Sequence, residues 1–386
     1  MPKKRGNNEG SIRQRKDGTW EGRYVSGYGA DGKPKRHSLF GKTKDVVQKK
    51  LREALSQLDR GEYVEPSKMT VGQWLDIWFW EYAKPHIRTS TATSHWSNIE
   101  SHLKPALGKQ LLQKLRTDQV QAFVNKQVKK GLAPATLRKQ MAPLKSAMKQ
   151  ATENQLILRN PVSFVRMPKL EQEEIQFLSI EEQQGLIKAL PATTVGRALR
   201  FILGTGLRAS ELCGLRWKDI MGDEFTVKQV VSSVKDIESK KYKLETNKPK
   251  TKAGQRTIPL LPSMMTLLDV QRRVQKEERM RVGELWTGGM PGQGETYVFA
   301  SAVGTPMDRN NMGRALRAAL EKAELKHRGV HALRHTFATN WVRTGKDLRS
   351  LSEILGHSNV AFTMQRYVHS EMETKRAAMR AMESLF

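Results

Sequence analysis

Three phrases near the carboxyl end decide how this chain is interpreted: His331-Ala-Leu-Arg-His-Thr-Phe337, Leu355-Gly-His357 and Gln365-Arg-Tyr-Val368. The first phrase is expected to open a helix and the second to end another, since a glycine commonly follows the last helical turn. They supply imidazole, guanidinium and phenol groups, which together suit attack on a phosphodiester. Each residue alone has an ordinary explanation on a solvated or packed helix face, and only their order along the chain favours a reactive site.

A second signal is the phrase Thr205-Gly-Leu-Arg-Ala-Ser-Glu-Leu212. Gly206 is expected to end a helix that starts near Val195, so Arg208 would emerge at a helix junction. Glu211 follows one turn later and could hold the guanidinium in place. The alternative is an ion pair that merely braces a loop.

A third signal is the basic segment 246–259, which we interpret as a hairpin turn between two strands. A hairpin tip would hold a long ammonium group over a neighbouring cleft. The segment offers two candidates, Lys250 and Lys252, which by strand alternation could face the same side. The alternative is a solvated turn.

The bulk composition favours nucleic acid as the partner. The chain has 386 residues, and its 67 Lys and Arg against 39 Asp and Glu give a net charge of +28, which is typical of proteins that bind a polyanion. No membrane partner is expected, because the richest apolar run, 74–80, is far shorter than the roughly 20 residues that a span requires. A single cysteine, Cys213, and a basic start without a secretory signal predict a reducing, cytoplasmic location. Cys213 itself is interpreted as a core residue rather than a nucleophile.

Residues 1–66 are expected to form a three-stranded sheet with one helix. Asp-Gly pairs at 17–18 and 31–32 predict two hairpins, and the helix should run from Thr43 to Gly61. Such a unit could lay a sheet face or its basic turns on DNA, or it could be a folded appendage with solvated lysines.

Residues 69–166 are expected to form an all-helical unit. Its helices should lie near 71–80, 90–107, 117–130 and 134–155. The outer positions carry a basic surface with few acidic partners, which favours phosphate contact over a merely solvated face. The residues of this basic surface are Lys126, Lys129, Lys130, Arg138, Lys139, Lys145 and Lys149.

Residues 174–386 are expected to form a mixed α/β unit. Ser179 and Glu182 predict a capping box at its first helix, and a β-rich island is expected at 225–259. An apolar strip on a short helix is expected at 373–386, where it could pack on its own domain. The whole chain is therefore predicted to be multidomain and mainly α with small β-sheets.

The chain resembles the tyrosine recombinases. Arg208, a lysine of the basic segment, His331 with Arg334, then His357 and Tyr367 stand in the order and at the separations of that family's active-site residues. The resemblance covers nearly the whole chain. It is closest to the integrases of phages and conjugative transposons, because that branch also carries a helical core-site binding domain and a small amino-terminal arm-site binding domain.

The resemblance implies a function for each part of the chain: an arm-site DNA-binding domain at 1–66, a core-site DNA-binding domain at 69–166, and a catalytic domain at 174–386. It also implies that the carboxy-terminal tail serves multimerisation by docking on a neighbouring protomer. Since recombination joins two duplexes, four protomers would act together.

The resemblance implies a nucleophile, a base and an acid. Tyr367 would attack the scissile phosphate and become joined to a DNA 3′-phosphate. A phenol has a pKa of about 10 and needs a proton acceptor, for which His331 is the candidate. A lysine would protonate the leaving 5′-oxygen. Lys250 matches the family phrase Pro-Lys-Thr better than Lys252, which stays an open alternative.

The resemblance also implies a clamp for the phosphate. Arg208 and Arg334 would hold the nonbridging oxygens with planar forks, and His357 would donate a further hydrogen bond. Glu211 would orient the cationic cluster. Two arginines can replace metal ions in neutralising the developing charge, so no metal or other cofactor is expected. Ala332, where this branch often has Asp, puts none of these roles in doubt.

The favoured function is a site-specific DNA recombinase that integrates and excises a mobile element or prophage. The alternative is a DNA-binding architectural or regulatory protein without strand exchange, against which the retention of every catalytic residue type argues. A type IB topoisomerase uses related chemistry but is disfavoured by the separate amino-terminal domain. The expected partners are double-stranded DNA at core and arm sites and three further copies of the chain. The resemblance leaves room for an excisionase and a host DNA-bending protein.

Overall fold

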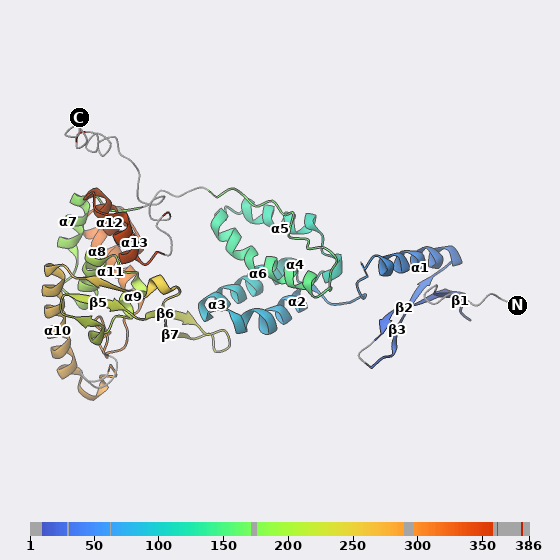
Figure 1. The fold of residues 1–386 in the computed structure, drawn as a ribbon, viewed down its shortest axis with the longest axis horizontal. Helices are drawn as coiled ribbons and strands as arrows, with labels where there is room; N and C mark the ends of the chain where they lie inside the picture. Colours follow the sequence, from blue (N-terminus) through green and yellow to red (C-terminus); the bar gives the residue numbers. More distant parts are fainter. Residues whose placement is uncertain are drawn as a thin grey trace. The chain divides into compact units, whose positions relative to one another are not determined.

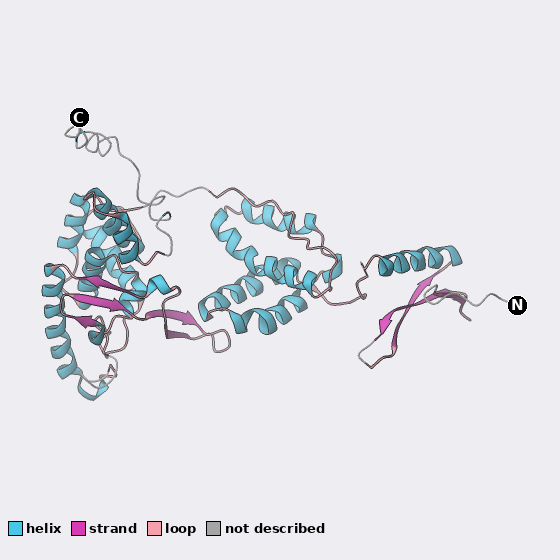
Figure 2. Ribbon diagram, viewed as in Figure 1, coloured by secondary structure: helices cyan, strands magenta, loops and turns pink. Residues whose placement is uncertain are grey.

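The chain is mainly helical with small antiparallel sheets, as the sequence predicts (Figures 1 and 2). The computed structural model describes residues 10–28, 31–61, 63–170, 176–288 and 296–357, together with positions 361 and 380. The chain divides into two compact units, Met1–Glu171 and Gln172–Phe386.

The amino-terminal part of the first unit is a sheet with one helix on one of its faces (Figure 2). In chain order its elements are β1 (Ser11–Gln14), β2 (Trp20–Tyr28), β3 (Pro34–Gly41) and α1 (Lys44–Asp59). The helix begins after Thr43, whose side chain accepts a hydrogen bond from the Val46 amide. Gly22 lets the helix approach the sheet, because a Cβ there would lie 2.7 Å from a methyl carbon of Val47. The predicted strands and helix are confirmed.

The rest of the first unit is helical. Its elements are α2 (Val71–Ile77), η1 (Trp78–Ala83), η2 (Lys84–His86), α3 (Thr89–Asn98), η3 (Ile99–Leu103), α4 (Lys104–Leu107), η4 (Leu112–Lys114), α5 (Thr117–Lys129) and α6 (Pro134–Glu153). Thr70 and Gln73 form a capping box at the start of α2. Trp74 is buried and donates from Nε1 to the Ala147 carbonyl at 2.8 Å, which joins α2 to α6. The four predicted helices are confirmed, two of them with π-helical turns, η1 and η3.

The second unit has helices around a small three-stranded sheet, and a two-stranded sheet extends away from them (Figure 1). Its elements are α7 (Ile180–Ala189), α8 (Thr194–Thr205), α9 (Ala209–Cys213), η5 (Trp217–Asp219), β4 (Ile220–Met221), β5 (Glu224–Val227), β6 (Val230–Lys235), β7 (Tyr242–Asn247), η6 (Lys252–Gly254), β8 (Arg256–Pro259), α10 (Pro262–Val282), η7 (Gly283–Leu285), α11 (Arg309–Lys322), α12 (His331–Arg343) and α13 (Leu348–Leu355). The predicted capping box is confirmed: Ser179 Oγ accepts from the Glu182 amide at 3.1 Å, and the Glu182 carboxylate accepts from the Ser179 amide at 2.9 Å.

The predicted hairpin around Lys250 and Lys252 is wrong. β7 pairs with β6 in a two-stranded sheet, whereas β8 pairs with β5 in the sheet β4-β5-β8. The basic segment therefore crosses from one sheet to the other. The partner of β8 lies about thirty residues upstream, as in the pair Thr226 and Thr257, and local alternation of residue types gives no information on so distant a partner.

The core of the second unit surrounds α8. The Phe201 ring packs against Phe225 and Phe299, with centroids 5.6 and 5.5 Å away. Cys213 belongs to this core, and burial raises the pKa of its thiol to about 12. Its interpretation as a core residue is confirmed. Across the residues that the structure describes, no helix combines the length and the apolar content that crossing a bilayer requires.

Candidate active site

The junction between α8 and α9 presents Arg208. Gly206 ends α8 in the left-handed conformation, with φ at 68°, and its amide donates to the Ile202 carbonyl. Glu211 on α9 accepts from the Arg208 amide at 3.0 Å and from Arg208 Nη1 at 2.6 Å. Two expectations are confirmed: Gly206 ends the helix, and Glu211 holds the Arg208 guanidinium. About a third of the Arg208 side chain, 35%, stays exposed, so an anion can reach it.

Arg334 lies in the first turn of α12 and is 1% exposed. Its Nη1 donates to the Gly206 carbonyl at 2.8 Å, and its Nη2 donates to the Leu355 carbonyl at 2.6 Å. The guanidinium therefore ties the end of α8 to the end of α13. A solvated helix face, the ordinary explanation for this arginine, is excluded.

The carboxyl end of α13 gathers three guanidinium groups. Three consecutive carbonyls each accept from a different arginine: Ile354 from Arg256, Leu355 from Arg334, and Gly356 from Arg208. The last contact is long, at 3.5 Å. Carbonyls at a helix carboxyl end have no partner within the helix and carry the negative end of its dipole, so they attract cations. The residues Leu355-Gly-His357 therefore both end α13 and hold arginine side chains of the site.

Arg256 is a member of the site that the sequence analysis missed. It opens β8, its side chain is 7% exposed, and it donates from Nη2 and Nη1 to the two carboxylate oxygens of Glu211 at 2.9 and 3.2 Å. A signal was present: strand alternation places Arg256 on the same side as Ile258, which is buried. An arginine on the inward side of a strand needs a partner.

Glu211 is ionised at the centre of the cluster. Burial raises the pKa of this carboxyl, yet the hydrogen bond from Arg256 and the charges of Arg256 and Arg208 outweigh burial and lower the pKa from 4.5 to about 2. Each carboxylate oxygen accepts from both arginines. Glu211 is therefore shared between Arg208, which is partly exposed, and Arg256, which is not.

Of the two candidate histidines, His357 contacts the cluster and His331 lies on the same helix as Arg334. Arg334 Nη2 donates to Nε2 of His357 at 3.0 Å. A guanidinium can only donate, so Nε2 is the acceptor in this contact. His331 opens α12, one turn before Arg334, and is exposed; its ring lies edge-on to that of His335 with centroids 4.6 Å apart.

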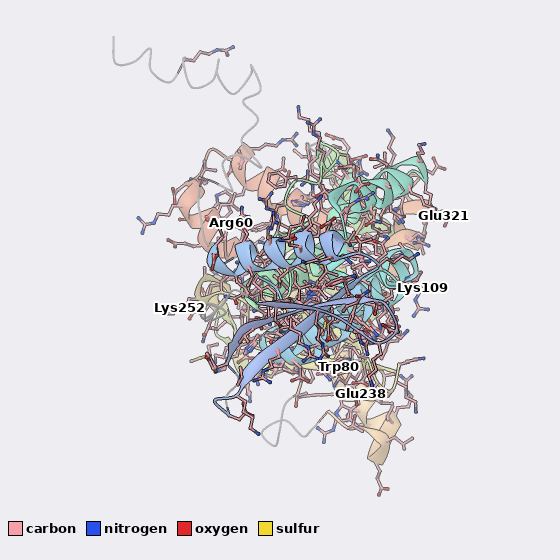
Figure 3. All side chains as sticks on the ribbon, turned by 90° about the vertical axis from the view of Figure 1, so that its right-hand side faces the viewer. Arg60, Trp80, Lys109, Glu238, Lys252 and Glu321 are labelled. Carbon is pink, nitrogen blue, oxygen red and sulfur yellow. The ribbon has the colours of Figure 1, made fainter. Side chains whose placement is uncertain are left out.

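The candidate lysines lie on the segment between β7 and β8. Both Lys250 and Lys252 are exposed, and Figure 3 labels Lys252. The segment touches the end of α13, because a Cβ on Gly356 would lie 2.8 Å from the Ala253 carbonyl oxygen. Tyr367, the predicted nucleophile, and the tail 373–386 lie outside the described residues, apart from position 380. In the described part of the chain, no three His, Cys, Asp or Glu side chains gather as metal ligands would.

Comparisons with known proteins identify the family of this chain. The phage integrase family matches residues 171–374, more than half of the chain, and the amino-terminal SAM-like domain of phage integrases matches residues 70–128. A tyrosine recombinase XerC-like protein of Caldanaerobacter subterraneus subsp. tengcongensis is 28% identical over 368 residues, covering 92% of this chain and 93% of the relative. The transposase from transposon Tn916 of Enterococcus faecalis is 25% identical over 411 residues, covering 98% and 97%.

Solved structures share the fold. The Tn1549 transposon integrase in complex with a circular intermediate DNA superposes with a TM-score of 0.66 at 23% identity, covering 81% of this chain and 99% of that chain. A lambda integrase tetramer bound to a Holliday junction gives a TM-score of 0.56 at 19% identity, covering 94% and 96%. With the family match, the order of the candidate residues and the guanidinium cluster, the chain belongs to the phage integrase family of tyrosine recombinases.

Proposed function

We propose that this chain integrates and excises a mobile DNA element by cutting and rejoining DNA through a 3′-phosphotyrosyl link. The observation that carries the proposal is the cluster of Arg208, Arg256 and Arg334 around one buried carboxylate and the end of α13. Three guanidinium groups so close together repel one another, and an anion bound beside them relieves that repulsion. A phosphodiester of DNA has the charge and the oxygen geometry that guanidinium forks match.

In the proposed reaction, the phenolic oxygen of Tyr367 attacks the scissile phosphorus while His331 takes the phenolic proton. The bond from phosphorus to the 5′-oxygen breaks, and a lysine returns a proton to that oxygen. Lys250 is our candidate and Lys252 the alternative. Arg208 and Arg334 hold the nonbridging oxygens, where charge develops in the transition state. The link to tyrosine keeps the energy of the broken bond, so rejoining needs no nucleotide hydrolysis.

His357 completes the phosphate site in this proposal. Its Nε2 accepts from Arg334, and its other ring nitrogen, Nδ1, is proposed to donate to a phosphate oxygen when DNA is bound. Because the histidine contacts Arg334 directly, its donor group is carried next to the guanidinium fork. Glu211 orients Arg208 without contacting the phosphate.

The helical part of the first unit, 69–166, is proposed to bind the core site. All seven members of its basic surface are exposed, and one of them, Lys149, pairs with Glu153 at 3.6 Å. When exposed cations of this kind contact DNA phosphates, the DNA releases its condensed counterions. This release favours binding, and the affinity falls as the salt concentration rises. The catalytic domain, 174–386, is proposed to close on the same site.

The sheet of the first unit, within 1–66, is proposed to bind arm sites. On the face opposite α1, the buried Glu21 carboxylate accepts from Nε of Arg13 at 2.7 Å and from Nε of Arg23 at 3.0 Å. The hydrogen bonds from Arg23 and then Arg13 lower the pKa of Glu21 to about 2. Held through Nε, both arginines keep their Nη groups for a phosphate or for the edge of a guanine.

Assembly on DNA is part of the proposal. Among structures with the same fold, the Tn1549 integrase is bound to circular intermediate DNA and the lambda integrase is a tetramer on a Holliday junction. By analogy we propose a homotetramer on double-stranded DNA. Its tail would dock on a neighbouring protomer, and an excisionase and a host DNA-bending protein would set the direction of the reaction. Action on the host genome implies a cytoplasmic location.

The test is formation of a covalent adduct. The substrate is a nicked duplex built from the direct repeats that flank the coding region, so that the cleaved fragment diffuses away and the adduct accumulates. We expect an adduct with the natural chain and none with Tyr367→Phe. Tyr242→Phe is the matched control, because Tyr242 is 73% exposed on β7 and has no proposed role. An adduct in Tyr367→Phe, or none in the natural chain, contradicts the proposal and favours a DNA-binding protein without strand exchange.

A further inference from the structure

We infer that Arg256 is a positioning residue for strand cleavage: it holds Arg208, His357 and the lysine segment in register without touching the phosphate. The inference rests on the proposed function. Arg256 donates to three elements at once: to Glu211 on α9, to the Gly254 carbonyl of η6 at 3.1 Å, and to the Ile354 carbonyl of α13. Its Nε, both hydrogens of Nη1 and one hydrogen of Nη2 are committed to these partners, so four of its five N–H groups are not available to a phosphate.

The first effect of Arg256 is on the charge that Arg208 presents. If Glu211 had Arg208 as its only partner, the buried carboxylate would cancel the charge of that guanidinium. Arg256 supplies the second cation, bound to both carboxylate oxygens. Glu211 can then fix Arg208 through two short contacts while the cluster as a whole stays positive. The positive charge is what a phosphodiester transition state requires.

The second effect of Arg256 is on the chain that carries His357. A Cβ on Gly356 would lie 2.9 Å from Arg256 Nη1, so the glycine rests directly on the guanidinium. The hydrogen bond to Ile354 fixes the preceding turn of α13. Arg256 therefore fixes the backbone that immediately precedes His357.

The third effect concerns the segment with Lys250 and Lys252. Arg256 donates back to the Gly254 carbonyl, and a Cβ on Gly254 would lie 2.7 Å from the Pro249 ring. The turn between Pro249 and Arg256 is therefore closed on itself and anchored to the cluster. Loss of Arg256 should loosen both lysines as well as the phosphate clamp.

The experiment compares Arg256→Met with Arg216→Met. Arg216 is the matched control: its side chain is 10% exposed and pairs with Asp219 at 2.7 Å, on η5 rather than in the cluster. Single-turnover cleavage of the nicked duplex is measured beside urea denaturation of each variant. We expect Arg256→Met to cleave about 100-fold more slowly than the natural chain, since displacement of reacting groups by about 1 Å has effects of that size. Arg216→Met should lose stability but cleave at the natural rate while folded.

A second substrate distinguishes an effect of Arg256 on the phosphate site from a general loss of structure in the variant. A methylphosphonate at the scissile position has no charge on its nonbridging groups, so it needs less cationic compensation. We expect the deficit of Arg256→Met to shrink to about tenfold or less on this duplex, because its lost contribution is largely charge presented through Arg208. An equal deficit on both duplexes shows that Arg256 does not act through the charge that Arg208 presents to the phosphate, and it overturns the inference.

Arg256→Lys covers the case in which Arg256→Met does not fold. Lysine keeps the charge beside Glu211 but lacks the two parallel N–H groups, so we expect a denaturation midpoint near that of the natural chain and cleavage about tenfold slower. If Arg256→Lys cleaves as fast as the natural chain, the planar guanidinium of Arg256 is not needed for positioning, and the inference is contradicted. If the natural chain forms no adduct, the proposed function fails. If the natural chain forms the adduct and Arg256→Met cleaves at the natural rate, only the inference on Arg256 fails.

Discussion

Glu211→Gln should destabilise the second unit by about 3 kcal/mol at pH 7. The substitution keeps the shape of the side chain and removes its charge. A carboxyl whose pKa is about 2 in the folded chain against an ordinary 4.5 gains about 3 kcal/mol from being ionised, at 1.36 kcal/mol for each pKa unit. The amide also turns an N–H group towards Arg208 or Arg256, which can only donate, so a buried donor loses its acceptor.

The contribution of Glu211 to the free energy of unfolding should also depend on pH. Since the folded chain lowers the pKa of Glu211, its contribution is complete above about pH 4.5 and is lost as the pH falls from about 4.5 towards 2. The natural chain should therefore lose stability through this window. Glu211→Gln should lose less over the same range, because one titrating group has been removed.

Hydrogen exchange measured by mass spectrometry suits this test, because peptides from α8 and α12 report on the second unit alone. Exchange is followed in urea at pH 7 and through the range from about 5 to 3. Glu321→Gln is the control, an exposed glutamate on α11 labelled in Figure 3. A free energy of unfolding for Glu211→Gln within about 0.5 kcal/mol of the control, or an unchanged slope with pH, would refute the reasoning.

Three further predictions follow from individual contacts. Gly356→Ala should lose about 1–2 kcal/mol, because φ is +64° and a Cβ would lie 2.8 Å from the Ala253 carbonyl oxygen; an unchanged urea midpoint would count against it. Glu182→Ala should lower the thermal midpoint by removing both its cap on Ser179 and its ion pair with Arg328 at 2.8 Å; a midpoint equal to that of the natural chain would contradict this. Affinity for duplex DNA should fall at least about tenfold between about 50 and 200 mM salt, and a flat fluorescence-anisotropy titration would exclude the proposed phosphate contacts.

Local signals predicted most of the fold. The capping box at Ser179, the helix end at Gly206 and the cap at Thr43 each involve residues within one turn of one another, so the sequence alone specifies them. The same holds for Arg208 and Glu211, because Arg208 is the N-cap of α9 and Glu211 lies in its first turn. These features need no knowledge of what packs against them.

The remaining features depend on partners that are distant in the sequence. The strand-like residues on both sides of the lysine segment predict a hairpin, but β8 pairs with β5 and β7 pairs with β6. The partners of Arg256 are equally distant: Glu211 is forty-five residues away in the sequence and Ile354 is ninety-eight away. Burial of Arg334 likewise depends on carbonyls of α8 and α13. Only the folded chain brings such groups together.

The three arginines are held mainly by backbone carbonyls, which explains how the site can be ordered and still carry positive charge. A carboxylate beside each arginine would fix the guanidinium groups but cancel their charge. A carbonyl is neutral, so it fixes a guanidinium through a hydrogen bond and leaves the charge for the substrate. Three arginines against the single carboxylate of Glu211 leave two positive charges in the cluster. This suits a phosphodiester, whose charge grows as the tyrosine adds, because the donors are already in place and need no rearrangement when the reaction begins.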